Sequence, residues 1–283
     1  MNPEVVGRET RSRVENHLGE IGFSPPAGVD FFTRIERFAA ILAQWGSRTN
    51  LTAHPQDPSE LAFHVIDSLA PLTVATQPDG AILEGCFAPD WRVLDLGSGA
   101  GFPGLILAAA CDAPFTLAEG RHKRASFLRV AAAEMGLGNV AIQGLEENVS
   151  RETLAARSST SCDSGAAPLP GDETNVSRET FVHRPERTPS AVGLSPDRSE
   201  NVSRETFDLV LGRAFAKPEV FCRTAAARLR KGRRAILYAR AEQPLPPVAV
   251  FPGPVEHLTI SYQVPRGNLA AARILAIWRK LSD

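Results

Sequence analysis

Hydrophobic side chains recur every three or four positions between residues 11 and 47, a spacing that predicts helices with one buried face. Ser24-Pro25-Pro26 interrupts this pattern, and Gly46 stands where a helix commonly ends, ahead of a polar turn. Asp57-Pro58 then starts a further helix. We therefore expect an N-terminal helical cap over residues 1–80.

The pattern changes after Trp91, where short apolar runs alternate with helical stretches. The apolar runs predict strands at residues 92–96, 115–119, 139–143, 207–211, 234–238, 258–262 and 273–278. The helical stretches between them cover residues 104–110, 123–135 and 219–229. This alternation is typical of a mostly parallel, doubly wound α/β sheet, which the last predicted strand would close in the antiparallel direction. We assign residues 81–147 and 207–283 to this domain.

Residues 148–206 do not continue the alternation. They are rich in Ser, Thr, Pro, Arg and Glu and have no apolar periodicity, which predicts a disordered, low-complexity insertion. The hexapeptide Asn-Val-Ser-Arg-Glu-Thr occurs three times, at residues 148–153, 175–180 and 201–206. Its codons can spell a palindrome that resembles the parS site of the partition protein ParB, and DNA palindromes suit dimeric binding proteins. We hypothesise that the coding DNA carries parS-like sites there; the alternative is a peptide motif for a protein partner.

Composition narrows the class of protein. The net charge is −1, so an RNA-binding surface would have to be a local patch. The four cysteines are scattered, without zinc-ligand or paired spacing, which favours reduced thiols and no metal site. The sequence has neither a signal peptide nor an apolar run of membrane-spanning length, so we expect a cytoplasmic protein with no membrane partner.

The candidate ligand site is a glycine-rich loop between a predicted strand and a predicted helix, with the sequence Asp95-Leu96-Gly97-Ser98-Gly99-Ala100-Gly101-Phe102-Pro103-Gly104. Glycines let the backbone approach a ligand closely, and a helix start offers free N–H groups. Gly99, Gly101 and Gly104 also fit the dinucleotide fingerprint, so an NAD-dependent oxidoreductase stays open. A strand-turn-helix that binds no ligand is the structural alternative.

Two acidic residues bear on the type of ligand. Asp95 stands just before the glycines, where a methyltransferase uses a carboxylate to organise the loop and face the ammonium of the cofactor's methionine moiety. Glu119 ends the next strand, where a carboxylate accepts hydrogen bonds from ribose hydroxyls, in NAD enzymes as well. Glu119 therefore predicts an adenosine-containing cofactor without choosing between the two classes.

Four short strings accompany the loop: Asn50-Leu51-Thr52, His64-Val65-Ile66-Asp67-Ser68-Leu69, Lys123-Arg124-x-x-Phe127-Leu128 and Arg213-Ala214-Phe215-Ala216. Their order is that of the RsmG (GidB) family of small-subunit rRNA guanine-N7 methyltransferases, which the chain resembles over about residues 30–147 and 207–280. The resemblance implies a class I, Rossmann-like methyltransferase fold, S-adenosyl-L-methionine as cofactor and 16S ribosomal RNA of the small subunit as partner. We expect a monomer.

The resemblance also implies residue roles. It places Gly97, Phe102 and Arg213 at the cofactor and Leu145-Glu146 beside the adenine, so that, with the loop and acidic residues above, the expected cofactor-binding residues are Asp95, Gly97, Ser98, Gly99, Phe102, Glu119, Leu145, Glu146 and Arg213. The implied catalytic residues, with positioning roles only, are Arg213, Phe215, His64 and Asp67. Guanine N7 carries an in-plane lone pair, so its methylation needs orientation and no general base. Phe215 or Phe102 could stack on the guanine, and Arg213 could bind a phosphate or the cofactor carboxylate.

The chain departs from the family pattern at Phe63, where the family has Arg, at Gly232-Arg233, where it has Gly-Gly, and in the insertion. Simpler interpretations also stay open. His64 could be a buried, hydrogen-bonded structural histidine, and Asp67-Ser68 a local capping arrangement. The basic residues 121–124 with Arg129 could be a solvated face. A non-catalytic RNA-binding scaffold is the third function class, disfavoured by the intact glycine loop.

Overall fold

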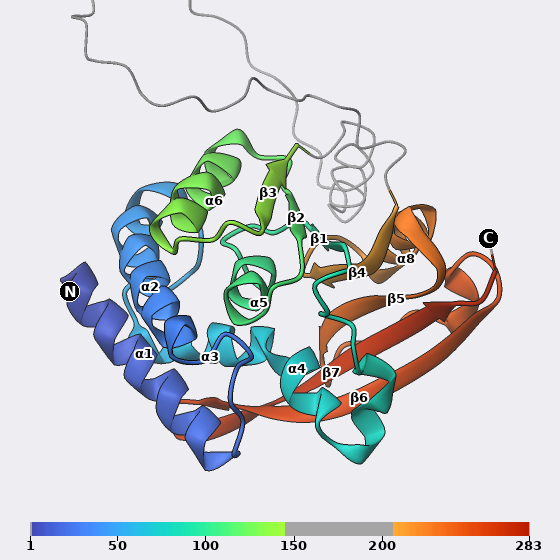
Figure 1. Cartoon of the computed structure of the whole chain (residues 1–283), viewed down its shortest axis with the longest axis horizontal. Helices are drawn as coiled ribbons and strands as arrows, with labels where there is room; N and C mark the ends of the chain where they lie inside the picture. Colours follow the sequence, from blue (N-terminus) through green and yellow to red (C-terminus); the bar gives the residue numbers. More distant parts are fainter. Residues whose placement is uncertain (1, 145–205, 283) are drawn as a thin grey trace, which may run out of the picture.

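The computed structural model describes residues 2–144 and 206–282, so Leu145, Glu146 and the predicted insertion with its repeats lie outside the described residues (Figure 1). A seven-stranded sheet in the order β3-β2-β1-β4-β5-β7-β6 forms its centre. The strands are β1 Val93–Leu96, β2 Phe115–Ala118, β3 Val140–Gln143, β4 Phe207–Arg213, β5 Leu229–Arg240, β6 Val255–Arg266 and β7 Leu269–Lys280.

Strands β1 to β5 pair in parallel, and β7 pairs antiparallel with both β5 and β6. The predicted mostly parallel sheet with an antiparallel C-terminal strand is confirmed. The hairpin of β6 and β7 is longer than its apolar runs predict, with 12 residues in each strand.

Helices cover both faces of the sheet. The helices α5 (Gly104–Ala110) and α6 (His122–Glu134) follow β1 and β2, and α8 (Pro218–Arg228) follows β4. Along β1 the buried side chains alternate between the two faces, as the strand period requires. Val93 belongs to the larger core with α5, whereas Leu94 belongs to the smaller core with α8. This two-sided packing is the doubly wound arrangement predicted for a class I, Rossmann-like fold.

The N-terminal segment is helical, as predicted. It comprises α1 (Pro3–Glu20), α2 (Val29–Thr49), α3 (Pro58–Ser68), α4 (Ala70–Ala75) and the 3₁₀ helix η1 (Pro78–Leu83). The side chain of Asn2 caps α1 and that of Asp57 caps α3, each by accepting a backbone N–H two residues on. These helices share the larger core with the sheet, so the cap packs as part of one body (Figure 1).

The predicted helix end at Gly46 is wrong. Helix α2 continues to Thr49, and Asn50 takes the left-handed conformation (φ 45°) that ends it. Gly46 is needed for a different reason, because a Cβ at this position would collide with the ring of Pro55. A glycine that is required by a close contact between α2 and the following loop thus looks, in the sequence, like a glycine that ends a helix.

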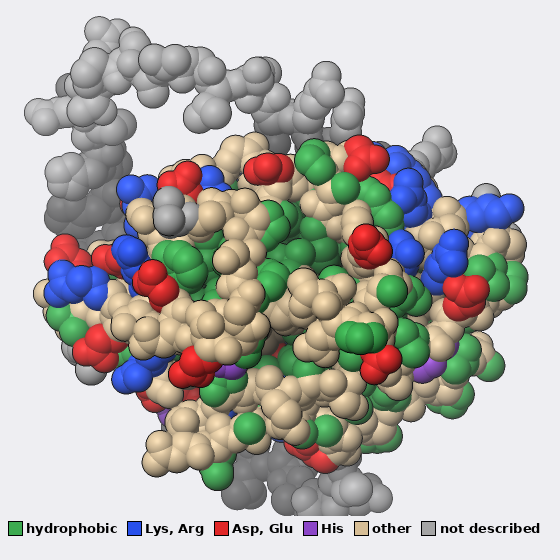
Figure 2. Space-filling view, turned by 60° about the horizontal axis from the view of Figure 1, so that its bottom comes forward, with side chains coloured by type: hydrophobic (Ala, Val, Ile, Leu, Met, Phe, Trp, Pro, Cys, Tyr) green, Lys and Arg blue, Asp and Glu red, His purple; other side chains and the backbone are tan. Residues whose placement is uncertain are grey.

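On the face shown in Figure 2, basic and acidic side chains are intermixed around a hollow lined with hydrophobic side chains. This mixture agrees with the net charge of −1. Within the two described ranges, no helix is both long and apolar enough to span a membrane.

Candidate functional site

A cavity of about 400 Å³ opens where β1, β4 and β5 end at their carboxyl termini. Its walls include Gly97–Ala100 after β1, Arg213 and Ala214 at the end of β4, and Leu237–Arg240 of β5. Open α/β sheets bind ligands at this edge, next to the position where the strand order reverses. In this sheet β2 and β3 are added on one side of β1, and β4 and β5 on the other side, so the strand order reverses between β1 and β4. The cavity lies at this switch point.

The glycine loop forms one end of the cavity through its backbone. Gly97, Gly99 and Gly101 have φ values of 72°, 58° and 93°, which side-chain-bearing residues rarely adopt. A Cβ on Gly97 would lie 2.6 Å from Cδ2 of Phe215. The loop therefore needs glycine both for its conformation and for the packing beneath it.

Asp95 lies fully buried behind this loop. Its Oδ2 accepts a hydrogen bond from the N–H of Gly104 at 3.1 Å, which fixes the start of α5. Burial raises the pKa of the Asp95 carboxyl to about 7. Its Oδ1 is buried and has no hydrogen-bond partner among the described residues. The hydrogen bond to Gly104 supports the predicted role of Asp95 in organising the loop. Asp95 does not line the cavity. Its contact with an ammonium group of a cofactor stays a prediction.

Glu119 joins the end of β2 to the loop. Its two carboxylate oxygens accept hydrogen bonds from the N–H of Gly99 at 2.9 Å and from the N–H of Arg121 at 2.8 Å. The predicted contact with ribose hydroxyls would use the remaining lone pairs of the carboxylate, which has more acceptor sites than two bonds occupy.

The opposite end of the cavity is organised by Asp67 of α3, whose side chain is fully buried. Arg213 donates to its Oδ2 at 2.9 Å, and Arg273 of β7 donates to both oxygens, at 3.2 and 2.9 Å. The hydroxyl of Tyr262 donates to Oδ1 at 2.7 Å. Burial alone would raise the pKa of Asp67, but the two guanidinium groups hold it below its ordinary value.

These contacts contradict the local capping interpretation of Asp67, because its partners come from β4, β6 and β7. Only Ser68 behaves locally, with its hydroxyl donating to the carbonyl of His64 at 2.7 Å. The string His64 to Leu69 thus contributes His64 to the cavity wall and, behind that wall, the buried carboxylate of Asp67, which joins distant parts of the chain.

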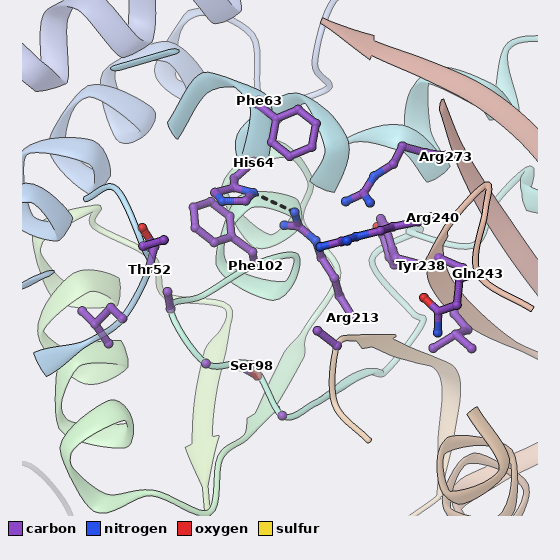
Figure 3. Close-up of a pocket in the computed structure, with 18 of the residues that line it drawn as sticks. Thr52, Phe63, His64, Ser98, Phe102, Arg213, Tyr238, Arg240, Gln243 and Arg273 are labelled. Atoms are coloured by element: carbon purple, nitrogen blue, oxygen red, sulfur yellow. Dashed lines mark hydrogen bonds between the residues drawn. The ribbon is translucent and has the colours of Figure 1, made fainter. Parts of the chain in front are cut away.

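His64 lies beside Arg213 in the cavity wall (Figure 3). Nη2 of Arg213 and Nδ1 of His64 are 2.8 Å apart. Since arginine can only donate, Nδ1 accepts, and the ring proton of the neutral imidazole is on Nε2. Burial and the charge of Arg213 lower the pKa of His64 to about 3, so the ring is neutral near neutral pH.

The two predicted stacking residues lie in different places. Phe102 lines the cavity, with its ring centroid 5.1 Å from that of His64 and 5.6 Å from Cζ of Arg213. Phe215 packs beneath the loop at Gly97 and is not among the lining residues. The stacking role of either ring stays a prediction. Among the basic residues at 121–124 and Arg129, Arg124 lines the cavity, whereas Arg121, His122, Lys123 and Arg129 are exposed.

Sequence reasoning missed the hairpin wall of the cavity. The residues concerned are Tyr238, Arg240, Gln243, Arg266 and Arg273, all at or near the ends of β5, β6 and β7. The hydroxyl of Tyr238 donates to the carbonyl of Ser68 at 2.9 Å, and Arg273 binds Asp67. No local motif marks these positions, because isolated polar residues at strand ends are ordinary surface features.

Residues 32–160 match the model of the GidB family, described as rRNA small subunit methyltransferase G. The matched range is a little under half of the chain. The matched range contains the glycine loop and the string His64 to Leu69, whereas α1 and the strands after β3 lie outside it. The predicted resemblance to the RsmG (GidB) family is thereby confirmed.

Curated relatives agree with this match. The ribosomal RNA small subunit methyltransferase G of Cupriavidus necator is 37% identical over 133 residues, which cover 46% of this chain and 55% of the relative. The protein of the same name from Wolinella succinogenes is 40% identical over 110 residues, 38% of this chain and 50% of the relative. The chain thus matches about half the length of these relatives.

Two solved methyltransferase structures are also similar. A putative O-methyltransferase from Klebsiella pneumoniae has a TM-score of 0.44 at 16% identity, covering 86% of this chain and 90% of that one. An O-methyltransferase from Bacillus cereus in complex with SAH has a TM-score of 0.44 at 14% identity, with 85% and 90% covered.

Proposed function

We propose that this GidB-family chain is an S-adenosylmethionine-dependent methyltransferase that acts on N7 of a guanine in small-subunit ribosomal RNA. The observation that carries the proposal is the placement of the family strings. The glycine loop and His64, which are far apart in the sequence, line one cavity, and Asp67 lies buried behind its wall, where it binds the lining residue Arg213. The named function of the curated relatives supplies the substrate class.

The glycine-loop end fits this cofactor. Two left-handed glycines, Gly97 and Gly99, line the cavity, and Glu119 at the end of β2 binds the N–H of Gly99. The unpartnered Oδ1 of Asp95 is a buried acceptor that suits a cationic ligand nearby. Arg124 lines the same end and suits a carboxylate. When bound there, the cofactor would supply the methyl group.

The opposite end suits orientation of a base. His64 is neutral and has a ring N–H on Nε2, and Phe102 offers an apolar surface beside it. Neither residue needs to accept a proton, because N7 of guanine attacks with its own lone pair. The chain's task is alignment and exclusion of water, which is catalysis by orientation.

Arg213 is the residue that connects these parts, because it contacts Asp67, His64 and Phe102. We expect Arg213→Ala to lower the rate of methyl transfer at least tenfold, since the neighbouring groups lose their common partner. Single-turnover methylation with labelled cofactor measures this, and an unchanged rate would remove Arg213 from the site.

The first experiment is calorimetric titration of the purified full chain with S-adenosylmethionine and, in parallel, with NAD. Saturable binding of S-adenosylmethionine alone, followed by methyl transfer to unmethylated small-subunit rRNA, is the expected result. Binding of NAD alone would favour the oxidoreductase alternative. Binding of RNA with neither cofactor would favour the scaffold alternative. The cytoplasmic location, the monomeric state and the parS-like sites stay predictions.

A further inference from the structure

A second cavity, of about 240 Å³, adjoins the first. Its walls come from α1, α3 and the turn between β6 and β7, and it includes Arg13, Asn16, His17, Ser59, Pro265 and Gly267. Phe63 of α3 lines both cavities, so they share a wall. No role for this second cavity follows from the family strings, none of which contributes a polar group to it.

Arg266 stands on the ridge between the cavities. Its side chain lines the first cavity, whereas its two chain neighbours, Pro265 and Gly267, line the second. Successive residues of a strand face opposite sides, so a residue at this position separates the two spaces. A ligand that occupies both cavities would therefore lie next to Arg266 and Phe63.

Arg266 is held in place by its contacts. Its Cζ lies 5.1 Å from the ring centroid of Phe63, and its Nε and Nη2 donate to the carboxylate of Glu60 at 2.8 and 3.0 Å. The guanidinium carries five N–H donors, and these two bonds leave the Nη1 group available. Since 52% of the side chain is exposed, that group can meet a ligand.

The two cavities differ in charge. Five arginines line the first: Arg124, Arg213, Arg240, Arg266 and Arg273. At the hairpin end Arg213, Arg240, Arg266 and Arg273 face three carboxylates, those of Asp67, Glu60 and Glu242, which leaves a local excess of one positive charge in a chain of net charge −1. The fifth arginine, Arg124, stands by the glycine loop, where the carboxylates of Asp95 and Glu119 lie behind the backbone. A concentrated positive field of this kind attracts anions such as RNA phosphates.

The second cavity offers a different chemistry. Its charged side chains are Arg13 and Glu20, which balance each other, beside His17. Asn16 and Ser59 add neutral hydrogen-bonding groups of the kind that contact bases and sugars. This wall suits the uncharged part of a nucleotide, whereas the ridge and the first cavity suit phosphate.

We propose that one RNA strand crosses the tip of the β6–β7 hairpin. The target nucleotide occupies the first cavity, the neighbouring nucleoside occupies the second, and Arg266 binds the phosphodiester between them. The proposal rests on the proposed function for the identity of the RNA. It assigns α1, which precedes the region matched to the family, to substrate binding.

The test measures binding of an unmethylated small-subunit rRNA transcript to the full chain at several salt concentrations, together with kcat and KM for its methylation. Arg266→Ala is compared with Arg279→Ala. Arg279 lies at the other end of β7, is 42% exposed and donates to Glu256 at 3.2 Å, so it reproduces an exposed ion pair on the same hairpin. Asn16→Ala is compared with Arg8→Ala, an exposed change on α1 that does not line the cavity.

We expect Arg266→Ala to raise KM for RNA about tenfold and to reduce the salt slope of binding by about one, as loss of one phosphate contact does. Asn16→Ala should raise KM severalfold without changing the salt slope, because it removes a neutral contact. Both controls should behave as the wild type, and all four variants should keep calorimetric binding of S-adenosylmethionine.

Two outcomes would overturn the proposal. If Arg266→Ala matches Arg279→Ala in KM and salt slope, the ridge does not bind phosphate. If Asn16→Ala matches Arg8→Ala, the second cavity lies off the RNA path. Failure of the proposed function has a different signature, namely a wild-type chain that binds RNA but transfers no methyl group to it. In that case the binding measurements still decide the path of the strand.

Discussion

At one end of the cavity the wall is backbone from a single loop, Gly97 to Ala100; at the other it is side chains from α3, β4 and β7. Three left-handed glycines give the loop its shape, and the side chains of Asp95 and Glu119 hold it from behind by accepting backbone N–H groups. The opposite end depends on Asp67, which binds an arginine 206 positions away in the sequence. The backbone end should therefore be disrupted by an added side-chain atom, whereas the ion-pair end should be disrupted by removal of a charged group.

The largest effect is expected at the ion-pair end. Asp67→Ala would leave the guanidinium groups of Arg213 and Arg273 close together, both at least four-fifths buried and without their shared carboxylate. Removing one partner of a buried ion pair typically costs about 3–5 kcal/mol. We expect a loss of this size in the free energy of unfolding, measured by urea denaturation.

Asp90→Ala is the matched control, because Asp90 is exposed and lies outside the cavity walls. It should change the free energy of unfolding by less than about 0.5 kcal/mol. Equal stability of the two variants would show that Arg213 and Arg273 find other partners and that Asp67 does not organise this end.

The backbone end should respond to one added methyl group. Gly97→Ala places a Cβ 2.6 Å from Phe215 and forces alanine into a left-handed conformation. The conformation costs about 1–2 kcal/mol and overpacking adds to it, so we expect a loss of about 2–3 kcal/mol in unfolding free energy. Binding of S-adenosylmethionine should weaken at least tenfold, because the loop shifts.

Gly138→Ala is the control for this change, since no atom lies within 4 Å of the added Cβ and its φ is not in the left-handed region. It should keep cofactor affinity unchanged. If Gly97→Ala binds the cofactor as tightly as Gly138→Ala, the glycine loop is not a wall of the cofactor site.

The same contrast explains what the sequence could predict. Strands β1, β2 and β3 were predicted to within a residue at each end, β1 at 92–96 against Val93–Leu96, because a short buried strand between a turn and a helix is a local signal. The glycine loop was found for the same reason. Strand β4 was predicted two residues short, and β5, predicted at 234–238, begins five residues earlier and ends two residues later. Strands β6 and β7 were predicted too short, because their outer ends are exposed and lack the apolar run that marks their buried middle.

The arginine end was only partly predictable. Asp67 and Arg213 were identified through the family strings. Arg273 and Tyr262 carry no local signal, because their role depends on a carboxylate that is 206 and 195 positions away in the sequence. Gly46 was misread for a related reason. Its requirement comes from contact with Pro55 in a following loop, whereas a pattern along the helix suggests a stop.

The smallest predicted effect is a change of stability with pH, caused by protonation of His64. The pKa of His64 is lowered to about 3 in the folded chain, against an ordinary value of 6.5. Below pH 6.5 His64 therefore binds a proton in the unfolded chain but stays neutral in the folded chain. The free energy of unfolding accordingly decreases as the pH falls. The stabilising contribution of His64 is complete above pH 6.5 and declines toward pH 3.

His64→Asn keeps an acceptor for Arg213 and removes the titrating ring. Between pH 6.5 and 5.5 we expect the wild type to lose about 1 kcal/mol more unfolding free energy than the variant, since one group can contribute at most about 1.4 kcal/mol per pH unit. The same substitution at exposed His122 is the control. A variant as acid-sensitive as the wild type would mean that His64 becomes protonated in the folded state. Arg213 could then no longer donate to Nδ1, and the contact that joins the arginine end to Phe102 would open in acid.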